Sequence, residues 1–260
     1  MKHAIIAMIT DFGTEDGYVG AMKGRIKGAM PGVDVIDISH EIDPYNIRQG
    51  AFCLHNSYPF FPDKTVFMVV VDPGVGTHRR GIVLKSSQHW FVGPDNGVFS
   101  FVYQREGVQV FEINLDAVAD HIAPTFHGRD VFAPVAARLA AGESMGDLLR
   151  PAGDPVSFLS EPRRLSEREF ALEILHVDHF GNLILNFHRS DWETLDHAAD
   201  FTIQLKGVHL TGLRETFGEA DQGELLLTWD STGYLQIAVN RGQAARRLGS
   251  VAGDEARLCL

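Results

Sequence analysis

Carboxylate and histidine side chains stand shortly after three short apolar segments. Asp11 follows residues 4–9, and Asp72 follows residues 65–71. The apolar segment at residues 33–38 is followed by His40, Glu41 and Asp43. If these segments are strands of one open α/β sheet, their carboxyl ends meet at one edge, where such folds bind ligands. Asp and Gly also end strands because they form turns, but three successive occurrences favour a polar ligand crevice.

The glycines near these carboxylates do not form a phosphate-binding loop. Residues 11–13 share three letters with a kinase signature, but the glycine-rich loop and the other kinase motifs do not accompany them. Gly74 and Gly76 lack the third glycine of a dinucleotide-binding fingerprint. A carboxylate can accept hydrogen bonds from both hydroxyls of a ribose diol. The crevice therefore suits a ribose better than a phosphate.

Two further polar clusters allow both a chemical and a purely structural interpretation. Asp72, Arg79 and His127 form a catalytic set if the fold brings them together, although a lone histidine is more often a surface or core residue. Asp178 and Asn182 flank a tight turn between two predicted strands. A hairpin whose glycine adopts a positive φ explains that turn equally well.

The first half of the chain alternates between strand and helix patterns. Continuous apolar runs predict buried strands at residues 4–9, 33–38, 65–71, 81–85, 90–92 and 108–113. Apolar residues at helical spacing predict helices over 16–30, 47–58 and 129–141. This alternation favours a mostly parallel sheet with helices on both faces, an α/β sandwich domain over residues 1–150.

Residues 151–168 break this pattern and predict a linker, because prolines and a charged cluster interrupt the apolar periodicity. After it come strand patterns at residues 170–177, 182–187, 201–205, 223–229, 234–239 and 256–260, with short helices near 190–194 and 243–248. We expect a compact β barrel or sandwich over residues 169–260.

The composition excludes several classes of partner. The 260 residues carry a formal charge of -11, which disfavours nucleic acid because its phosphates need a basic face. No apolar run approaches the roughly 20 residues of a transmembrane helix, and residues 4–9 are too short for a signal peptide core. Cys53 and Cys259 show no metal-ligand spacing. We expect a cytoplasmic protein that binds neither nucleic acid nor membrane.

Six motifs occur in an order that identifies a family. They are Thr10-Asp11-Phe12-Gly13 with Asp16-Gly17-Tyr18-Val19, Val71-Asp72-Pro73-Gly74-Val75-Gly76-Thr77, Gly93-Pro94-Asp95-Asn96-Gly97, Phe126-His127-Gly128-Arg129-Asp130, Asp178 to Asn182, and Ile237-Ala238-Val239-Asn240. From about Ile5 onwards the sequence resembles the S-adenosyl-L-methionine (SAM) hydroxide adenosyltransferase family, the adenosine-forming SAM hydrolases. It is more distantly similar to the SAM-dependent fluorinases and chlorinases. The resemblance implies an N-terminal α/β domain, a C-terminal β-barrel domain, and a homotrimer with SAM bound between domains of neighbouring subunits.

The resemblance also implies roles for eight substrate-binding residues. Asp11 matches the carboxylate that holds the ribose hydroxyls, and Tyr45 matches an aromatic residue beside the nucleoside. The positions that match contacts to the methionine amine and carboxylate are Asp16, Asp178 and Ser231. Those that match adenine contacts are Asn182 and the backbone near Asn240 and Arg241.

Asp72, Arg79 and His127 match the Asp-Arg-His set that the family places around an attacking water. The halogenating relatives carry a tyrosine in place of Asp72 and, in the fluorinase, a halide-contacting serine in place of Gly128. A desolvated halide needs a site free of competing negative charge, so Asp72 favours hydrolysis. Arg79 stays protonated and cannot be the base; either His127 or Asp72 accepts the proton. The resemblance implies no cofactor and no metal, since SAM is the substrate.

Two other functions remain as alternatives. A metal-dependent hydrolase of a nucleoside derivative could use Asp11, Asp72, His78 and His127 as ligands. A non-catalytic protein could bind SAM or adenosine in the same crevice. Dependence on a divalent cation distinguishes the first alternative from metal-free hydrolysis, and formation of adenosine from SAM distinguishes an enzyme from the second.

Overall fold

The computed structural model describes residues 4–105, 107–159, 161–195 and 201–260. The chain divides into two compact units, Met1–Leu159 and Ser160–Leu260, and each is described by itself below. The division falls within residues 151–168, the predicted linker. None of the helices among the described residues combines the length and the apolar character that crossing a bilayer requires.

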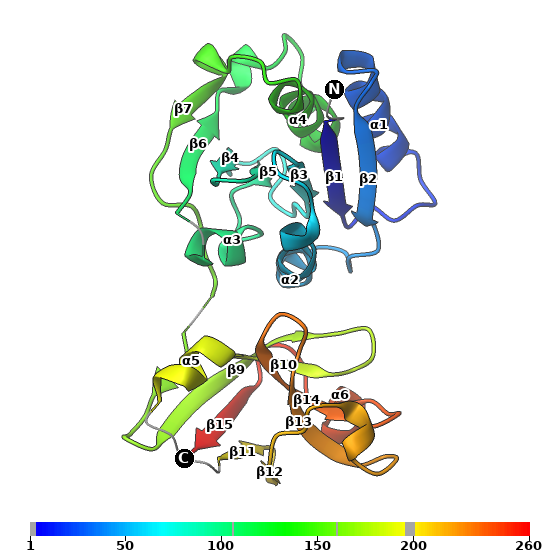
Figure 1. The fold of residues 1–260 in the computed structure, drawn as a ribbon. Coiled ribbons are helices and arrows are strands. Elements are labelled where there is room, and N and C mark those ends of the chain that lie inside the picture. Colours follow the sequence, from blue (N-terminus) through cyan, green and yellow to red (C-terminus); the bar gives the residue numbers. More distant parts are fainter. Residues whose placement is uncertain (1–3, 106, 160, 196–200) are drawn as a thin grey trace. The chain divides into compact units, whose positions relative to one another are not determined.

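The first unit is built on a seven-stranded sheet with the order β2-β1-β3-β5-β4-β6-β7 (Figure 1). Its strands are β1 (Ile5–Thr10), β2 (Asp34–Ser39), β3 (Val66–Val70), β4 (Gly81–Lys85), β5 (Trp90–Pro94), β6 (Gln109–Ile113) and β7 (Leu149–Pro151). The pairs β2-β1, β1-β3 and β3-β5 are parallel, whereas β5-β4, β4-β6 and β6-β7 are antiparallel.

The sheet is therefore mixed, and the prediction of a mostly parallel sheet was wrong for its second half. The connection between β4 and β5 runs only from residue 86 to residue 89. A parallel connection needs about a dozen residues or more, so this short link forces an antiparallel hairpin. The strands themselves lie close to the predicted ranges, and only β7 had no counterpart in the sequence pattern.

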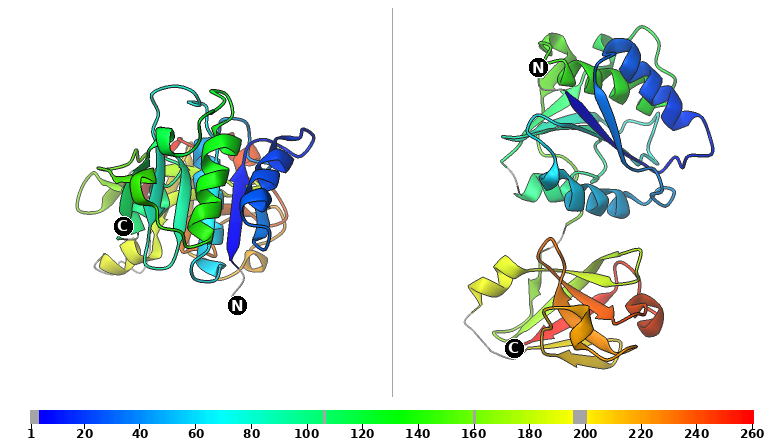
Figure 2. Two further views of the ribbon diagram at one scale, coloured as in Figure 1. Left: turned by 90° about the horizontal axis from the view of Figure 1, so that it is seen from above. Right: turned by 45° about the vertical axis from the view of Figure 1, so that its right-hand side comes forward.

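Helices cover both faces of this sheet, as the sequence predicts. They are α1 (Tyr18–Ala29), α2 (Ile47–Ser57), α3 (Ser100–Arg105) and α4 (Ala133–Ala140), with a π-helical turn η3 (Gly128–Phe132) leading into α4. Single turns of 3-10 helix are η1 (Tyr58–Phe60), η2 (Leu115–Ala117) and η4 (Gly146–Leu148). Figure 1 and the right-hand view of Figure 2 show the strands between α1 and α4 on one side and α2 and α3 on the other.

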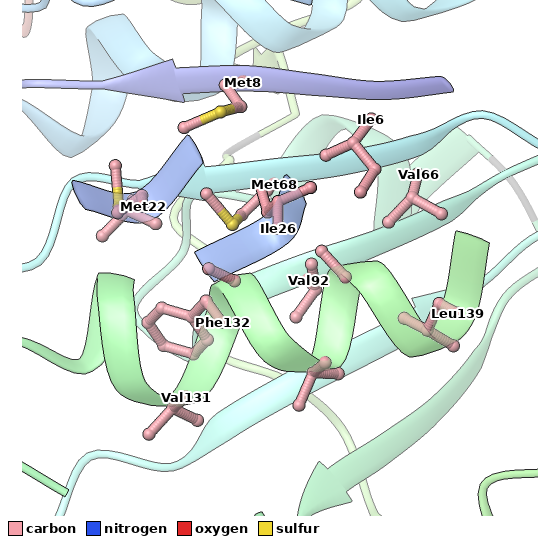
Figure 3. Packing of buried hydrophobic residues seen from close by; sticks show 14 of the residues in the cluster. Ile6, Met8, Met22, Ile26, Val66, Met68, Val92, Val131, Phe132 and Leu139 are labelled. Atoms are coloured by element: carbon pink, nitrogen blue, oxygen red, sulfur yellow. The ribbon is translucent and has the colours of Figure 1, made fainter. Parts of the chain in front are cut away.

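Alternation along β1 explains this layering, because successive side chains of a strand point to opposite faces. Ile6 and Met8 pack with Met22 and Ile26 of α1 and with the segment around Phe132 (Figure 3). Ala7 and Ile9 belong to a second cluster on the α2 and α3 side. All four β1 residues are fully buried, so packing on both faces holds the strand in place. The position of Asp11, just after the strand at the sheet edge, is thereby set.

The connection from β3 to β4 has an unusual path. In the sheet, β5 lies between β3 and β4, although it follows both of them in the chain. Residues 71–80 must therefore cross the end of β5 to reach β4. Asp72 stands near the start of this crossing loop, and Arg79 stands near its end.

The second unit is an antiparallel, nearly closed barrel-like sheet with the order β12-β11-β15-β9-β10-β14-β13. Its elements are β8 (Arg163–Arg164), which pairs with β9 (Glu169–Val177), then β10 (Leu183–His188), α5 (Arg189–Thr194), β11 (Thr202–Leu205), β12 (Val208–Thr211), η5 (Phe217–Glu219), β13 (Leu225–Trp229), β14 (Tyr234–Val239), α6 (Ala244–Leu248) and β15 (Glu255–Cys259). A bridge between Leu213, just after β12, and Leu227 of β13 brings the two edges together. The sheet encloses its own core of aliphatic side chains, among them Leu185, Leu235 and Leu258.

Candidate active site

Three neighbouring parallel strands end at the same edge of the sheet. Each is followed by polar residues that were identified in the sequence. In the parallel group β2-β1-β3, Thr10 pairs with Val70 and Ile9 pairs with Ser39. Asp11, His40 and Asp72 follow these paired positions by one or two residues. The prediction that the carboxyl ends of these strands meet at one edge is confirmed.

Asp72 and Arg79 form a buried, two-pronged ion pair across the crossing loop. Nε of Arg79 donates to Oδ1 of Asp72 over 3.1 Å, and Nη2 donates to Oδ2 over 2.5 Å. The two side chains are only 5% and 8% exposed, respectively. Nη1 donates to the carbonyl oxygen of Arg80 over 2.9 Å, and the guanidinium carbon lies 5.5 Å from the centre of the Phe132 ring. Contacts on all sides therefore fix the guanidinium of Arg79.

His127 reaches the same guanidinium from a different part of the chain. Its Nδ1 lies 3.2 Å from Nη2 of Arg79, and the residue is buried. It stands immediately before the π-helical turn η3. The crossing loop and the loop before His127 touch at Gly76, where a Cβ atom would lie 2.6 Å from the carbonyl oxygen of Pro124. Gly76 has a φ of +75°, so glycine is needed there for both conformation and space.

The contact between Arg79 and His127 defines a tautomer. A guanidinium can only donate hydrogen bonds. Nδ1 of His127 must then accept, and a neutral His127 carries its proton on Nε2. The Nε2–H group is thus the part of the imidazole that remains able to donate.

The environment moves the pKa values of both partners of Arg79. Burial raises the pKa of Asp72 above its ordinary value, and the charge and hydrogen bonds of Arg79 oppose that rise. Burial lowers the pKa of His127, the positive charge of Arg79 lowers it further, and the negative charge of Asp72 opposes both. His127 is consequently neutral at pH 7, and Asp72 binds a proton more readily than an ordinary aspartate.

Asp11 lies at the same strand edge and is half-buried. Its Oδ2 accepts a hydrogen bond from the backbone N–H of Tyr45 over 2.9 Å, and burial raises its pKa. Tyr45 has a φ of +69° and is 71% exposed, so its ring is free to contact a ligand. The neighbouring backbone is held by His40, whose Nδ1 lies 2.8 Å from Oγ1 of Thr10 and whose carbonyl accepts from the N–H of Gly13.

Aromatic rings lie between the Asp11 segment and the His127 segment. Phe12, Tyr18 and Phe126 form a cluster with centroid separations of 5.9, 6.0 and 5.3 Å. Gly128 packs into it, since a Cβ atom there would lie 2.8 Å from Sδ of Met22 and 3.4 Å from both phenylalanine rings. Asp16 is exposed in the turn before α1.

In the second unit, Asp178 and Asn182 close the turn between β9 and β10. The carboxylate of Asp178 accepts from the backbone N–H and from Nδ2 of Asn182, both over 2.8 Å. Gly181 in this turn has a φ of +78°. These bonds support the interpretation of Asp178 and Asn182 as residues that stabilise a hairpin turn. Binding roles for the two residues stay predictions.

The remaining three residues of the second unit lie at opposite ends of β14. Asn240 and Arg241 follow the strand, at the end where β10 begins, and Nδ2 of Asn240 donates to the carbonyl of Ala220 over 2.7 Å. Ser231 is exposed on the turn that precedes the strand. Because antiparallel strands place successive turns at opposite ends, this unit does not bring Ser231 together with the other four residues.

The described residues contain no group of three or more His, Cys, Asp or Glu side chains that could hold a metal ion. Both carboxylate oxygens of Asp72 already bind the guanidinium of Arg79, whose positive charge opposes a cation at that position. His78, the fourth ligand of the metal-dependent alternative, is exposed on the crossing loop. This donor set therefore does not fit a metal centre.

Sequence patterns did not identify Phe132 and Gly76 as parts of the site. Phe132 supports Arg79 from the π-helical turn, and Gly76 permits contact between two loops that are far apart in sequence. The positive φ of Gly76 has a local sequence signal, because glycine recurs where such angles are needed. No local sequence signal indicates that the Phe132 ring contacts Arg79.

Comparisons with known proteins place both halves of the chain in the same family. A family model described as the SAM hydroxide adenosyltransferase N-terminal domain matches residues 6–149. A second model, described as the C-terminal domain of the same family, matches residues 172–257.

Individual proteins that are similar to this chain also match it over nearly its whole length. The (R)-S-adenosyl-L-methionine hydrolase of Salinispora tropica is 40% identical over 260 residues, which cover 97% of each chain. A fluorinase of an Actinoplanes species is 30% identical, covering 96% of this chain and 95% of that protein. The crystal structure of a conserved protein from Thermotoga maritima superposes with a TM-score of 0.88 at 36% identity, covering 98% of this chain and 100% of the other.

Proposed function

The chain belongs to the SAM hydroxide adenosyltransferase family, and we propose that it hydrolyses SAM to adenosine and L-methionine. The observation that carries the proposal is the buried constellation of Asp72, Arg79 and His127, which offers a carboxylate, a fixed positive charge and a neutral imidazole to one water molecule. The relatives named (R)-S-adenosyl-L-methionine hydrolase support the same substrate.

The chemistry requires little from the protein at the leaving group. In SAM the sulfur is a sulfonium, so the C5′–S bond can break with its electron pair returning to sulfur, and neutral methionine departs without an acid. The oxygen of water forms the new bond to C5′ and must lose one proton. Because water has a pKa of about 15.7, the site must position it and help to remove that proton.

We assign the proton to Asp72. Nδ1 of His127 accepts from Arg79, so a neutral His127 presents an N–H group at Nε2 and orients the water rather than deprotonating it. Asp72 retains lone pairs beyond those used by Arg79, and burial raises its pKa toward that of a useful base. Arg79 stabilises the negative charge that develops on the oxygen.

We propose that Asp11 binds the ribose diol and that Tyr45 lies against the nucleoside. The half-buried carboxylate of Asp11 and the exposed ring of Tyr45 support these roles. Asp16, Asp178 and Ser231 as methionine contacts, and Asn182, Asn240 and Arg241 as adenine contacts, rest on the family resemblance.

The same resemblance supports a homotrimer and a reaction without cofactor or metal. A location in the cytoplasm rests instead on the sequence composition and on the two free thiols of Cys53 and Cys259. Light scattering coupled to size-exclusion chromatography measures the oligomeric state. A mass of one or two chains contradicts the trimer.

Incubation with SAM in water enriched in ¹⁸O tests the reaction. We expect adenosine with ¹⁸O at its 5′-hydroxyl and unlabelled methionine, formed equally fast in excess chelator. Loss of activity in chelator, restored by a divalent cation, supports the metal-dependent alternative instead. Binding of SAM without any product supports the non-catalytic alternative, and 5′-halo-adenosine as the main product in chloride or fluoride contradicts hydrolysis.

A further inference from the structure

The motif Gly93-Pro94-Asp95-Asn96-Gly97 has no part in the mechanism above, yet it spans the carboxyl end of β5, which the crossing loop passes over. We propose that Asp95 and Asn96 are positioning residues that hold the two ends of this loop and thereby set the distance between Asp72 and Arg79. The inference rests on the proposed hydrolase function and adds two residues to it.

Asn96 holds the beginning of the loop. Its Nδ2 donates to the carbonyl oxygen of Val71 over 2.8 Å, and Val71 is the residue immediately before Asp72. The side-chain oxygen of Asn96 accepts from the N–H of Val98 over 3.2 Å, which orients the amide. The amide therefore fixes the backbone from which the Asp72 side chain projects.

Asp95 holds the end of the loop. Its backbone N–H donates to the carbonyl of Arg80 over 2.9 Å, and its buried carboxylate accepts from Nε and Nη2 of Arg80. The carbonyl of Arg80 also accepts from Nη1 of Arg79. The oxygen that orients the Arg79 guanidinium is thus itself anchored by Asp95.

The strand order explains why the loop needs both anchors. Residues 71–80 leave β3, pass over the end of β5 and enter β4, so they gain no strand partner on the way. Apart from the Asp72–Arg79 pair itself, the bonds within the loop are short-range turns, such as Thr77 Oγ1 to the carbonyl of Gly74. Misplacement of a reacting group by about 1 Å can lower a rate a hundredfold, so both ends of the loop require support.

Asn96 gives a cleaner test than Asp95, because the carboxylate of Asp95 also accepts from the N–H of Val156 and so helps to dock residues 154–158. Asn114 provides a matched control. It too follows a strand of the first unit, and its Nδ2 donates to a backbone carbonyl, that of Asp147, over 3.1 Å. Asn96→Ala and Asn114→Ala each remove a bond of this kind, and Asn96→Ala also removes the bond from Val98. Only the bond to Val71 reaches the crossing loop.

The experiment measures kcat, the Kd for SAM and the Tm of both variants. We expect Asn96→Ala to lower kcat by about tenfold to a hundredfold with Kd within about twofold of wild type, because only the positioning of the reacting groups is lost. Asn114→Ala should lower Tm as well, but leave kcat within about twofold. Asn96→Asp, measured on the alkaline plateau of its pH profile, loses the donor without losing side-chain volume and should resemble Asn96→Ala even if the alanine variant folds poorly.

A double-mutant cycle separates positioning from general stability. In an Arg79→Ala background, Asn96→Ala should reduce kcat by less than about twofold, since the Asp72–Arg79 pair whose geometry the loop sets is already broken. Full additivity, or an unchanged kcat in Asn96→Ala and Asn96→Asp, overturns the inference while the hydrolase function stands. Unchanged kcat in Arg79→Ala itself, or no adenosine from the wild-type protein, overturns the proposed mechanism or function and the inference with it.

Discussion

Nη2 of Arg79 lies 3.2 Å from Nδ1 of His127, although the two residues are 48 positions apart in the chain. The same Nη2 donates to Oδ2 of Asp72 over 2.5 Å. One guanidinium nitrogen therefore links the crossing loop to the segment before the π-helical turn. The chemistry proposed for this site depends on that single connection.

Removing any of the three linked side chains should lower kcat while SAM binding persists. We expect Asp72→Asn, Arg79→Ala and His127→Ala each to reduce kcat by about 10²–10⁴-fold, with Kd for SAM near that of wild type. Pairs of these changes should cost little more than one, because the residues act as a unit. Steady-state kinetics and calorimetry measure both quantities. Three variants with kcat within about twofold of wild type would make these residues purely structural.

The titration of His127 should respond with opposite signs to its two neighbours. Besides burial, the positive charge of Arg79 lowers the pKa of His127, and the negative charge of Asp72 raises it. Arg79→Gln should therefore raise the pKa of His127, whereas Asp72→Asn should lower it. Two-dimensional NMR of the imidazole Cε1–H group as a function of pH gives both values. A shift of the same sign in both variants contradicts the arrangement.

The activity of the wild-type protein should fall on the acidic side as Asp72 takes up a proton. Burial raises the pKa of Asp72, so the midpoint in kcat/KM should lie above about 3.9, the value of an ordinary aspartate. Arg79 lowers that pKa, and Arg79→Gln should move the midpoint of its residual activity to still higher pH. An unmoved midpoint assigns the acidic limb to another group.

Asp11→Ala should weaken binding of ligands that carry ribose hydroxyls. A buried, charge-assisted hydrogen bond contributes about 1.5–3 kcal/mol, which corresponds to roughly tenfold to a hundredfold in the Kd for adenosine. The Kd for 2′,3′-dideoxyadenosine should change by less than about twofold, because it offers no diol to the carboxylate. Calorimetry with both nucleosides distinguishes this role from a general loss of structure, which weakens both ligands equally.

Gly76→Ala should disturb the contact between the crossing loop and the loop before His127. A left-handed alanine costs about 1–2 kcal/mol wherever it stands, and at residue 76 the Cβ also meets the carbonyl of Pro124. Gly142 is the matched control, since it has a φ of +69° and no atom within 4 Å of a built Cβ. We expect Gly142→Ala to lower only the Tm, and Gly76→Ala to lower the Tm further and kcat as well. Equal effects of the two changes would show that the contact is not needed.

Local sequence patterns were sufficient to predict most of the elements and to single out the candidate residues. The apolar runs at 4–9 and 65–71 became β1 and β3, and Tyr234–Val239 forms β14 with the predicted bounds. Such patterns are readable because burial on both faces of a strand, or on one face of a helix, imposes a local period. The ordered motifs also indicated the family, which the comparisons confirmed.

The way in which these residues meet depends on the pairing of distant strands. Nothing local reveals that β5 inserts between β3 and β4, yet this order makes residues 71–80 cross the sheet edge above Asp95 and Asn96. The mixed character of the sheet likewise follows from one short connection rather than from strand composition. Local sequence sets which faces are buried, whereas the pairing of distant strands sets which loops become neighbours. The approach of Arg79 to His127 depends on which loops become neighbours, because the crossing loop and the loop before His127 meet at Gly76.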